Sequence, residues 1–286
     1  MFFGTTPAPV RDYLASELQR TKSKRVFEPC AGNFVLSFVC GALDKTIEVR
    51  SGDVSLYSVA IGCGLASKDI GIKLKDEYLE TYPFFKGKSS PIEVAATVIM
   101  WAELAKNLER KHIAYYASLA RDLTENAEKY FVEILGKIKK AKESLGNFSF
   151  TAQDACITIQ DAGEGDFVLY DPPYYIGDYE KEYAAMCSCF DAPAIPYTII
   201  TPELKAQHLV ELAACGTRTF FRCEEVVEVP GYNVVFDYLY RKARIARDTE
   251  RRVLGLHQPK VHVGAHGIRD PSVHGQPGFD EVPRIV

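Results

Sequence analysis

Residues 166–175 read Asp-Phe-Val-Leu-Tyr-Asp-Pro-Pro-Tyr-Tyr and gather the side chains best suited to chemistry. The apolar run from Phe167 to Tyr170 is typical of a buried parallel strand. It ends at the Asp-Pro-Pro of 171–173, because proline donates no hydrogen bond to a sheet and fixes its own φ. An acid, two rigid carbonyl groups and the ring of Tyr174 therefore follow the carboxyl end of a strand, where open α/β sheets bind their ligands.

This combination suits an exocyclic amino group such as that of adenine, whose lone pair is delocalised into the ring. Asp171 and the carbonyl of Pro172 can accept its two N–H hydrogens, which frees the lone pair for attack on an activated methyl group. The ring of Tyr174 can stack on a base that has left the duplex stack. We therefore predict Asp171, Pro172, Pro173 and Tyr174 as catalytic residues, without a metal. The simpler interpretation is a strand followed by a proline turn with Tyr174 packed beside it.

The composition is that of a globular chain with one large domain, or one domain with an insert. Its 286 residues are 47% hydrophobic and 25% charged, enough for a sizeable core. No apolar run approaches the ~20 residues of a membrane span, and the start lacks a signal-peptide pattern. The net charge of −4 confines nucleic-acid binding to local patches. We expect a cytoplasmic protein whose eight cysteines are reduced thiols.

The elements upstream of the motif begin as an α/β fold. A short helix over residues 11–20 precedes a strand at Val26-Phe27. The turn 28–34 follows, and an apolar helical run comes after it. Strand, Gly-bearing turn and helix form the opening unit of a doubly wound fold. A second strand, 46–50, ends near Asp53, an acid about 20 residues beyond the turn.

Residues 68–147 differ in character and predict a helical insert. Apolar residues recur there at helical intervals, and glycine and proline are nearly absent after Pro91. Its single tryptophan, Trp101, is expected in the core. The end of the insert is basic, which fits either phosphate contacts or a solvated face, through Lys137, Lys139 and Lys140.

The remainder alternates again and ends in a basic tail. We expect extended segments at 148–151, 155–160, 217–222 and 234–240, with a helix over 204–214. The loop 176–202 is expected beside the site. Residues 246–286, rich in Gly, Pro and His, are expected to form a loosely packed tail. The arginines before and at its start suit phosphate contacts as well as they suit a solvated face: Arg241, Arg244 and Arg247.

Four elements in a fixed order resemble the DNA adenine methylases of bacteria and bacteriophages. These elements are the turn 27–34, Gly52-Asp53, the Phe150-to-Asp154 segment and Asp-Pro-Pro-Tyr at 171–174. The resemblance is closest to the subgroup whose target-recognition region precedes Asp-Pro-Pro-Tyr, as the insert does here. It implies an S-adenosylmethionine-dependent, Rossmann-like methyltransferase fold with a helical insert. The catalytic domain would comprise residues 1–67 and 148–245, in the cytoplasm of a bacterium or phage-infected cell.

The resemblance also implies a role for each element. The first turn would wrap the methionine portion of S-adenosylmethionine, Asp53 would bind the ribose hydroxyls, and Asp154 would contact the cofactor's adenine amino group. Residues 171–174 would hold an adenine flipped out of double-stranded DNA. The implied cofactor-binding residues are Phe27, Glu28, Pro29, Ala31, Gly32, Asn33, Phe34, Asp53, Asp154 and Asp171.

Two features depart from the family pattern. The first turn carries only Gly32 where the family has two or more glycines, and the amino terminus lacks the family's Gly-Gly-Lys-like element. Two alternatives therefore stay open beside a DNA methyltransferase. One is an RNA adenine methyltransferase, and the other is a non-catalytic nucleic-acid-binding protein on the same fold.

Overall fold

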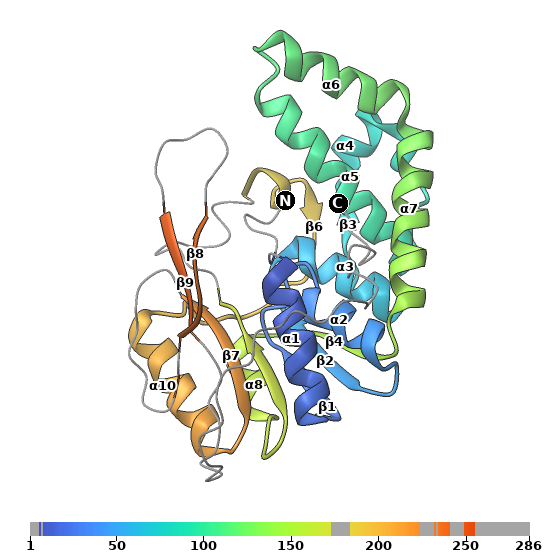
Figure 1. Cartoon of the computed structure of the whole chain (residues 1–286). Coiled ribbons are helices and arrows are strands. Elements are labelled where there is room, and N and C mark those ends of the chain that lie inside the picture. The colour runs from blue at the N-terminus through green and yellow to red at the C-terminus, as the bar shows by residue number, and fades with distance from the viewer. Residues whose placement is uncertain are drawn as a thin grey trace, which may run out of the picture.

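The computed structural model describes residues 6, 8–172, 184–223, 232, 234–240 and 249–254. Its centre is a seven-stranded sheet with the strand order β4-β2-β1-β5-β7-β9-β8 (Figure 1). The first five strands in this order run parallel, and β9 runs antiparallel to both β7 and β8. The strands are β1 Arg25–Glu28, β2 Glu48–Asp53, β4 Asn147–Ala152, β5 Phe167–Tyr170, β7 Arg218–Cys223, β8 Val234–Tyr240 and β9 Thr249–Leu254. This architecture confirms the predicted Rossmann-like methyltransferase fold.

Helices cover both faces of the sheet because successive strand residues point to opposite sides. Phe167 and Leu169 of β5 pack with α1 and α2, whereas Val168 and Tyr170 pack with α8 and α10. The helices of this part are α1 Ala8–Thr21, α2 Val35–Leu43, α3 Leu56–Ala66, α8 Ala155–Gln160 and α10 Pro202–Ala214. The chain continues from β1 to β2 toward one edge of the sheet and from β5 to β7 toward the other edge. The strand order therefore reverses between β1 and β5. Ligands of open α/β sheets bind at such a switch point.

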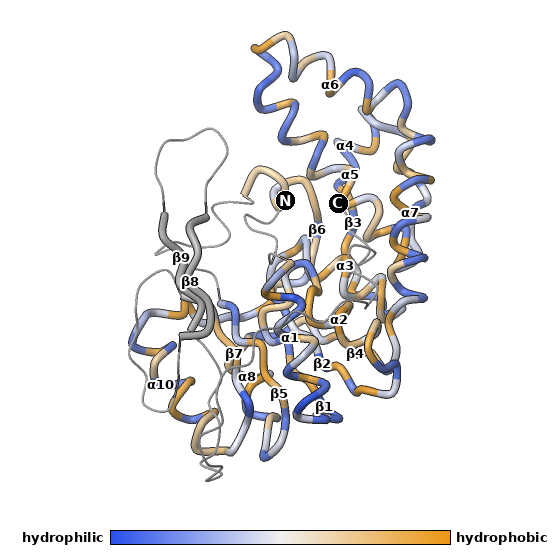
Figure 2. Tube along the Cα trace, in the orientation of Figure 1, coloured by the Kyte–Doolittle hydropathy of each residue, from blue (hydrophilic) through white to orange (hydrophobic). Residues whose placement is uncertain are grey.

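The insert is helical, as predicted. Its elements are β3 Lys73–Leu74, α4 Asp76–Thr81, η1 Pro83–Phe85, α5 Pro91–Glu109, α6 Ala114–Glu125 and α7 Ala127–Ser144. Helix α5 packs on α3 within the largest core cluster, so the insert shares a hydrophobic core with the helices that cover the sheet. Strand β3 pairs with β6, Phe190–Asp191, from the segment beyond the Asp-Pro-Pro motif. Hydrophobic residues gather around the sheet, α2 and α3, while α6 and α7 alternate in hydropathy (Figure 2).

Trp101 lies in the core, as predicted, at the centre of an aromatic cluster. Its ring meets those of Tyr78, Tyr82, Phe85 and Phe190 edge-on, with centroids 5.2 to 6.4 Å apart. Edge-to-face pairs at such distances are favourable beyond their buried area. The cluster therefore joins α4, η1 and α5 of the insert to β6.

None of the helices that the structure describes has the length and apolar character of a membrane span.

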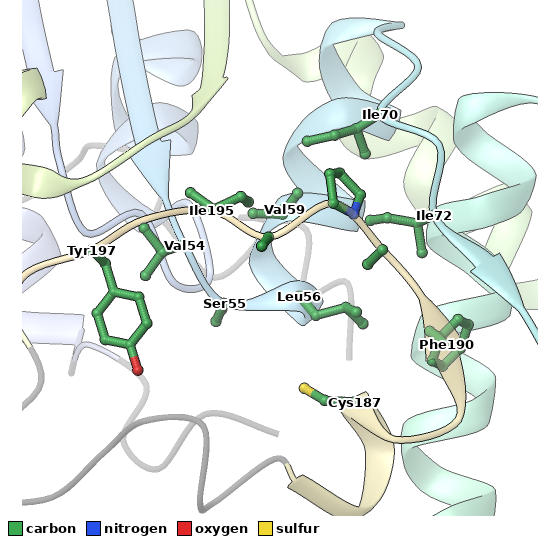
Figure 3. A pocket seen from close by; sticks show the side chains of 13 residues that line it. Val54, Ser55, Leu56, Val59, Ile70, Ile72, Cys187, Phe190, Ile195 and Tyr197 are labelled. Carbon is green, nitrogen blue, oxygen red and sulfur yellow. The ribbon is translucent and has the colours of Figure 1, made fainter.

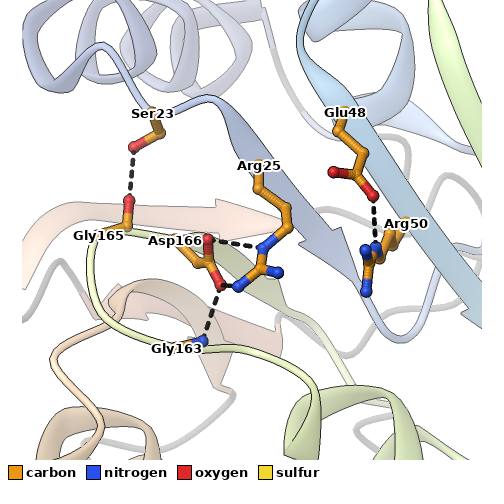
Figure 4. Close-up of polar contacts among 7 residues, drawn as sticks. All are labelled: Ser23, Arg25, Glu48, Arg50, Gly163, Gly165 and Asp166. Carbon is orange, nitrogen blue, oxygen red and sulfur yellow. Dashed lines mark hydrogen bonds and ion pairs between the residues drawn. The ribbon is translucent and has the colours of Figure 1, made fainter.

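An ion pair joins the amino ends of β1 and β5 (Figure 4). Arg25 donates to Asp166 in bidentate fashion, with Nε 2.9 Å from Oδ1 and Nη2 2.5 Å from Oδ2. The Gly163 N–H also donates to Asp166, at 2.7 Å, and the Ser23 hydroxyl donates to the carbonyl of Gly165 at 3.2 Å. These contacts hold β1 and β5 side by side from the edge opposite the predicted site.

Two expectations about secondary structure were wrong. Residues 155–160 form helix α8 rather than an extended segment, because the carboxylate of Asp154 caps the helix by accepting from Cys156 N–H at 2.8 Å. Residues 249–254 form strand β9 rather than part of a tail, since this segment pairs with both β7 and β8. The remaining tail residues, 255–286, lie outside the described residues.

Candidate active site

The predicted acids meet at the carboxyl edge of the sheet. Asp154 follows β4, Asp53 ends β2, the turn 29–34 follows β1 and Asp171 follows β5. These four strands are consecutive neighbours, and adjacent strands lie about 4.8 Å apart, so the edge from β4 to β5 extends about 14 Å. Asp171 is partly buried, while Pro173 and Tyr174 lie outside the described residues. The edge therefore suits an elongated ligand.

The turn after β1 is tied to the end of β2. The Ala31 N–H donates to the carbonyl of Gly52, and the Gly32 N–H donates to Oδ2 of Asp53, both at 2.9 Å. Gly32 has a φ of +50°, a conformation that favours glycine. A side chain there would meet nothing closer than 4.0 Å, so the turn is open above Gly32. Gly32 is therefore the one glycine in a turn where the family usually has two or more.

Most side chains predicted to wrap the cofactor face the core instead. Phe27, Pro29, Ala31 and Phe34 are buried, whereas Gly32 and Asn33 are partly exposed. Phe34 packs edge-on against the rings of Phe148 and Phe150. Its backbone adopts a left-handed φ of +58° in spite of its large side chain. A ligand would thus reach backbone atoms of the turn and the side chain of Asn33.

Glu28 also points inward and closes the start of α2. Its side chain is 1% exposed and accepts from Leu36 N–H at 2.9 Å, from Ser37 Oγ at 2.5 Å and from Ser51 Oγ at 3.1 Å. Burial raises its pKa to about 7 although these hydrogen bonds oppose the shift. The first N–H groups of α2 therefore serve an internal carboxyl group, and this helix start is not an open phosphate site.

Asp53 is held by three backbone donors. Its Oδ1 accepts from the N–H groups of Val54 at 2.8 Å and Ser55 at 2.9 Å, and Oδ2 accepts from that of Gly32. Burial raises the pKa of Asp53, and these hydrogen bonds oppose the rise. The side chains of Ser55 and Ser58 also hydrogen-bond to this carboxylate, so protein donors take up its roughly four acceptor positions. A ligand hydroxyl would bind Asp53 by replacing one of these donors.

Asp154 lies under the segment 192–200, which the sequence predicts only as part of a loop. Besides capping α8, it accepts from the Thr198 N–H at 2.5 Å, and it is 7% exposed. Burial by itself would raise its pKa, but the hydrogen bonds from Cys156 and Thr198 outweigh it and lower the pKa. The segment 192–200 therefore covers the acid that was predicted to contact the cofactor's adenine.

An apolar cavity of about 240 Å³ adjoins Asp53 (Figure 3). Val54, Ser55 and Leu56 form one wall, and the segment carrying Ile195 and Tyr197 crosses another. Its lining residues are Val54, Ser55, Leu56, Val59, Ile70, Ile72, Cys187, Phe190, Ala192, Pro193, Ala194, Ile195 and Tyr197. The position of Val54 directly after the acid was a usable sequence signal. No sequence signal predicts that 187–197 lines the cavity, because no local pattern of residues places this segment over β2.

The predicted nucleic-acid-binding residues do not join this site. Lys137, Lys139 and Lys140 are exposed, but they lie in the later turns of α7, which lead toward the amino end of β4. The acids lie at the opposite edge. The arginines at 241, 244 and 247 lie outside the described residues. Among the residues that the structure describes, no cluster of three potential metal ligands occurs.

A protein-family model described as Phage DNA Adenine Methylase-like domain 1 matches residues 2–256. The chain belongs to this phage DNA adenine methylase-like family. Membership confirms the resemblance inferred from the four elements, and together with the fold it indicates methyl transfer. No curated protein matches the chain.

Two solved structures are similar to this phage DNA adenine methylase-like chain. TrmN from Thermus thermophilus is 12% identical with a TM-score of 0.36, over 90% of this chain and 50% of TrmN. The chain thus spans half the length of that protein. A conserved hypothetical protein from Streptococcus pyogenes is 10% identical with a TM-score of 0.28, over 83% of this chain and 90% of that one.

Proposed function

We propose that this chain transfers a methyl group from S-adenosylmethionine to the N6 amino group of adenine in double-stranded DNA. The observation that carries the proposal is the row of Asp154, Asp53, the Gly32 turn and Asp171 along one sheet edge. Family membership supports it independently. The two halves expected from the sequence, for cofactor and for target base, adjoin across neighbouring strands β1 and β5.

The charge of the site fits this cofactor. When bound, S-adenosylmethionine supplies a methyl group on a positively charged sulfur. Three aspartates lie along the edge, and the start of α2 is occupied by Glu28, so the site favours cations and hydroxyl groups over phosphates. Asp53 would accept from a ribose hydroxyl in place of one of its protein donors, and the cavity beside Val54 offers an apolar wall for a flat ring.

Asp171 would act on the target base. Together with the carbonyl of Pro172, it would accept the two amino hydrogens and leave the nitrogen lone pair directed at the methyl group. The contribution to the rate is positional and electrostatic, since it holds the nucleophile where the reaction requires it. Tyr174 would stack on the flipped base.

DNA recognition belongs to the insert in this proposal. Figure 1 shows the insert helices rising beyond the carboxyl edge of the sheet, with the β8–β9 pair rising on the other side. A duplex at this edge would meet both. The lysines of α7 lie toward the other edge, so we assign base recognition to the upper part of the insert instead.

The test uses labelled methyl transfer from S-adenosylmethionine to matched duplex DNA and RNA. We expect the unmodified chain to transfer the methyl group to DNA. Asp171→Asn should lower the rate of this transfer by at least about 100-fold. Calorimetric binding of S-adenosylmethionine should largely survive in this variant. Glu203→Gln, an exposed change on α10, serves as the control. Retained activity in Asp171→Asn would refute the site, and preferential transfer to RNA would identify the other substrate.

A further inference from the structure

A hydrogen bond joins the strand that carries Asp171 to helix α10. Tyr170, the last residue of β5, has its hydroxyl 2.6 Å from Nδ1 of His208, and the two rings meet edge-on with centroids 5.7 Å apart. Tyr170 is 0% exposed and His208 is 5% exposed. This contact is a polar link in an otherwise apolar layer formed with Val168, Leu209 and Phe221.

The link favours one arrangement of β5 against α10. Burial lowers the pKa of His208 and raises that of Tyr170, so both groups are neutral near pH 7. A neutral imidazole and a phenol can satisfy each other, whereas a buried hydroxyl without its partner costs about 1–3 kcal/mol. Sliding or rotating Tyr170 would break this bond, while the apolar neighbours alone tolerate such shifts.

The chain beyond Tyr170 is too stiff to absorb such a shift. Asp171 precedes a proline, which restricts its backbone to extended conformations, and the next two residues have a fixed φ. The position of the Asp171 backbone, from which its side chain projects, is therefore set by the position of Tyr170. A misplacement of about 1 Å at a reacting group can lower a rate about 100-fold.

We infer that His208 is a positioning residue for methyl transfer, acting through Tyr170 to hold Asp171 in its reactive orientation. The inference rests on the proposed function. His208 would contact neither S-adenosylmethionine nor the target base. It follows Asp171 by 37 positions and lies on another element, so no local sequence pattern connects the two.

The test compares variants of both partners. Tyr170→Phe and His208→Phe each remove one side of the bond but keep an aromatic ring. We expect each to lower kcat by about 10- to 100-fold. The KM for DNA and the Kd for S-adenosylmethionine should change less than about twofold, because Asp171 remains present. The double variant should be no slower than either single one. His208→Asn, which can place a polar atom near Nδ1, should recover part of kcat.

A matched control separates positioning from stability. Thr217 makes a comparable buried bond under α10, with Oγ1 donating to the carbonyl of Leu212 at 2.7 Å, but it precedes β7 at the opposite edge. Thr217→Val should lower Tm about as much as Tyr170→Phe and leave kcat unchanged. An equal loss of kcat in both would overturn the inference, as would full kcat in Tyr170→Phe.

Hydrogen exchange tests the anchoring without any activity. In Tyr170→Phe, the backbone amides at positions 170 and 171 should exchange severalfold faster than in the unmodified chain. The exchange of the β2 amides should stay unchanged. Unchanged exchange at these two amides would overturn the anchoring. If the unmodified chain transfers no methyl group, the proposed function fails, and the exchange result still decides whether His208 positions Asp171.

Discussion

At the scale of single residues, the most informative group is Glu28. The pattern Glu-Pro-x-Ala-Gly placed this acid in a cofactor turn, and the structure places its carboxyl group in the core against Ser37 and Ser51. Glu28 therefore stabilises the turn from its buried side. Because burial raises its pKa from 4.5 to about 7, Glu28 also makes the stability of the fold depend on pH.

Proton binding by Glu28 sets the direction of this pH dependence. Between pH 4.5 and 7 the folded chain keeps the Glu28 proton that the unfolded chain loses, so stability falls as pH rises through this window. The shift corresponds to roughly 3 kcal/mol. Glu28→Gln does not titrate, so its free energy of unfolding should rise relative to the unmodified chain by roughly this amount between pH 5 and 8.

Urea denaturation of both proteins at four pH values measures this difference. Ser37→Ala serves as a second variant, since it removes a hydrogen bond that lowers the Glu28 pKa and should extend the fall in stability to higher pH. Parallel stability curves for the unmodified chain and Glu28→Gln would contradict the assignment.

At the scale of elements, the segment 192–200 connects the insert to Asp154 at the carboxyl edge of the sheet. It continues from β6, which pairs with β3 and contacts Trp101, and it reaches Asp154 through the N–H of Thr198. If Asp154 binds the cofactor's adenine as predicted, this hydrogen bond competes with the ligand. An opening step of this kind weakens the apparent affinity.

Thr198→Pro removes the competing N–H, and we expect the calorimetric Kd for S-adenosylmethionine to fall severalfold. Thr198→Ser keeps both the N–H and the side-chain hydroxyl that hydrogen-bond to Asp154, and it should bind as the unmodified chain does. Weaker binding in the proline variant alone would show that the segment supports the site rather than covering it.

At the scale of the whole molecule, cofactor binding should stabilise the fold. The site draws on β1, β2 and β4 together, so a ligand that spans them binds only the folded chain. At 100 times its Kd, S-adenosylmethionine should add about 2.7 kcal/mol and raise Tm by several degrees. Asp53→Asn should reduce the shift, and S-adenosylhomocysteine should act as a second ligand. No shift with either would favour the non-catalytic alternative.

Much of this fold could be predicted because its signals are local. Tyr170 and Asp171 stand at a strand end marked by prolines, and the acid at 53 follows a strand at the expected distance from the first turn. Residues 155–160 were mispredicted because six apolar and polar residues carry no clear period. The helix there depends on the cap from Asp154.

The sequence by itself determined the fold class, the helical insert and the order of the acids, since parallel strands bring consecutive strand ends to one edge. Only the tertiary structure decided which side chains face that edge. Glu28 turned into the core, Thr198 met Asp154 from 44 positions away, and His208 met Tyr170 from 38. Contacts at such separations depend on how loops and helices pack across the sheet, which no local pattern of residues encodes.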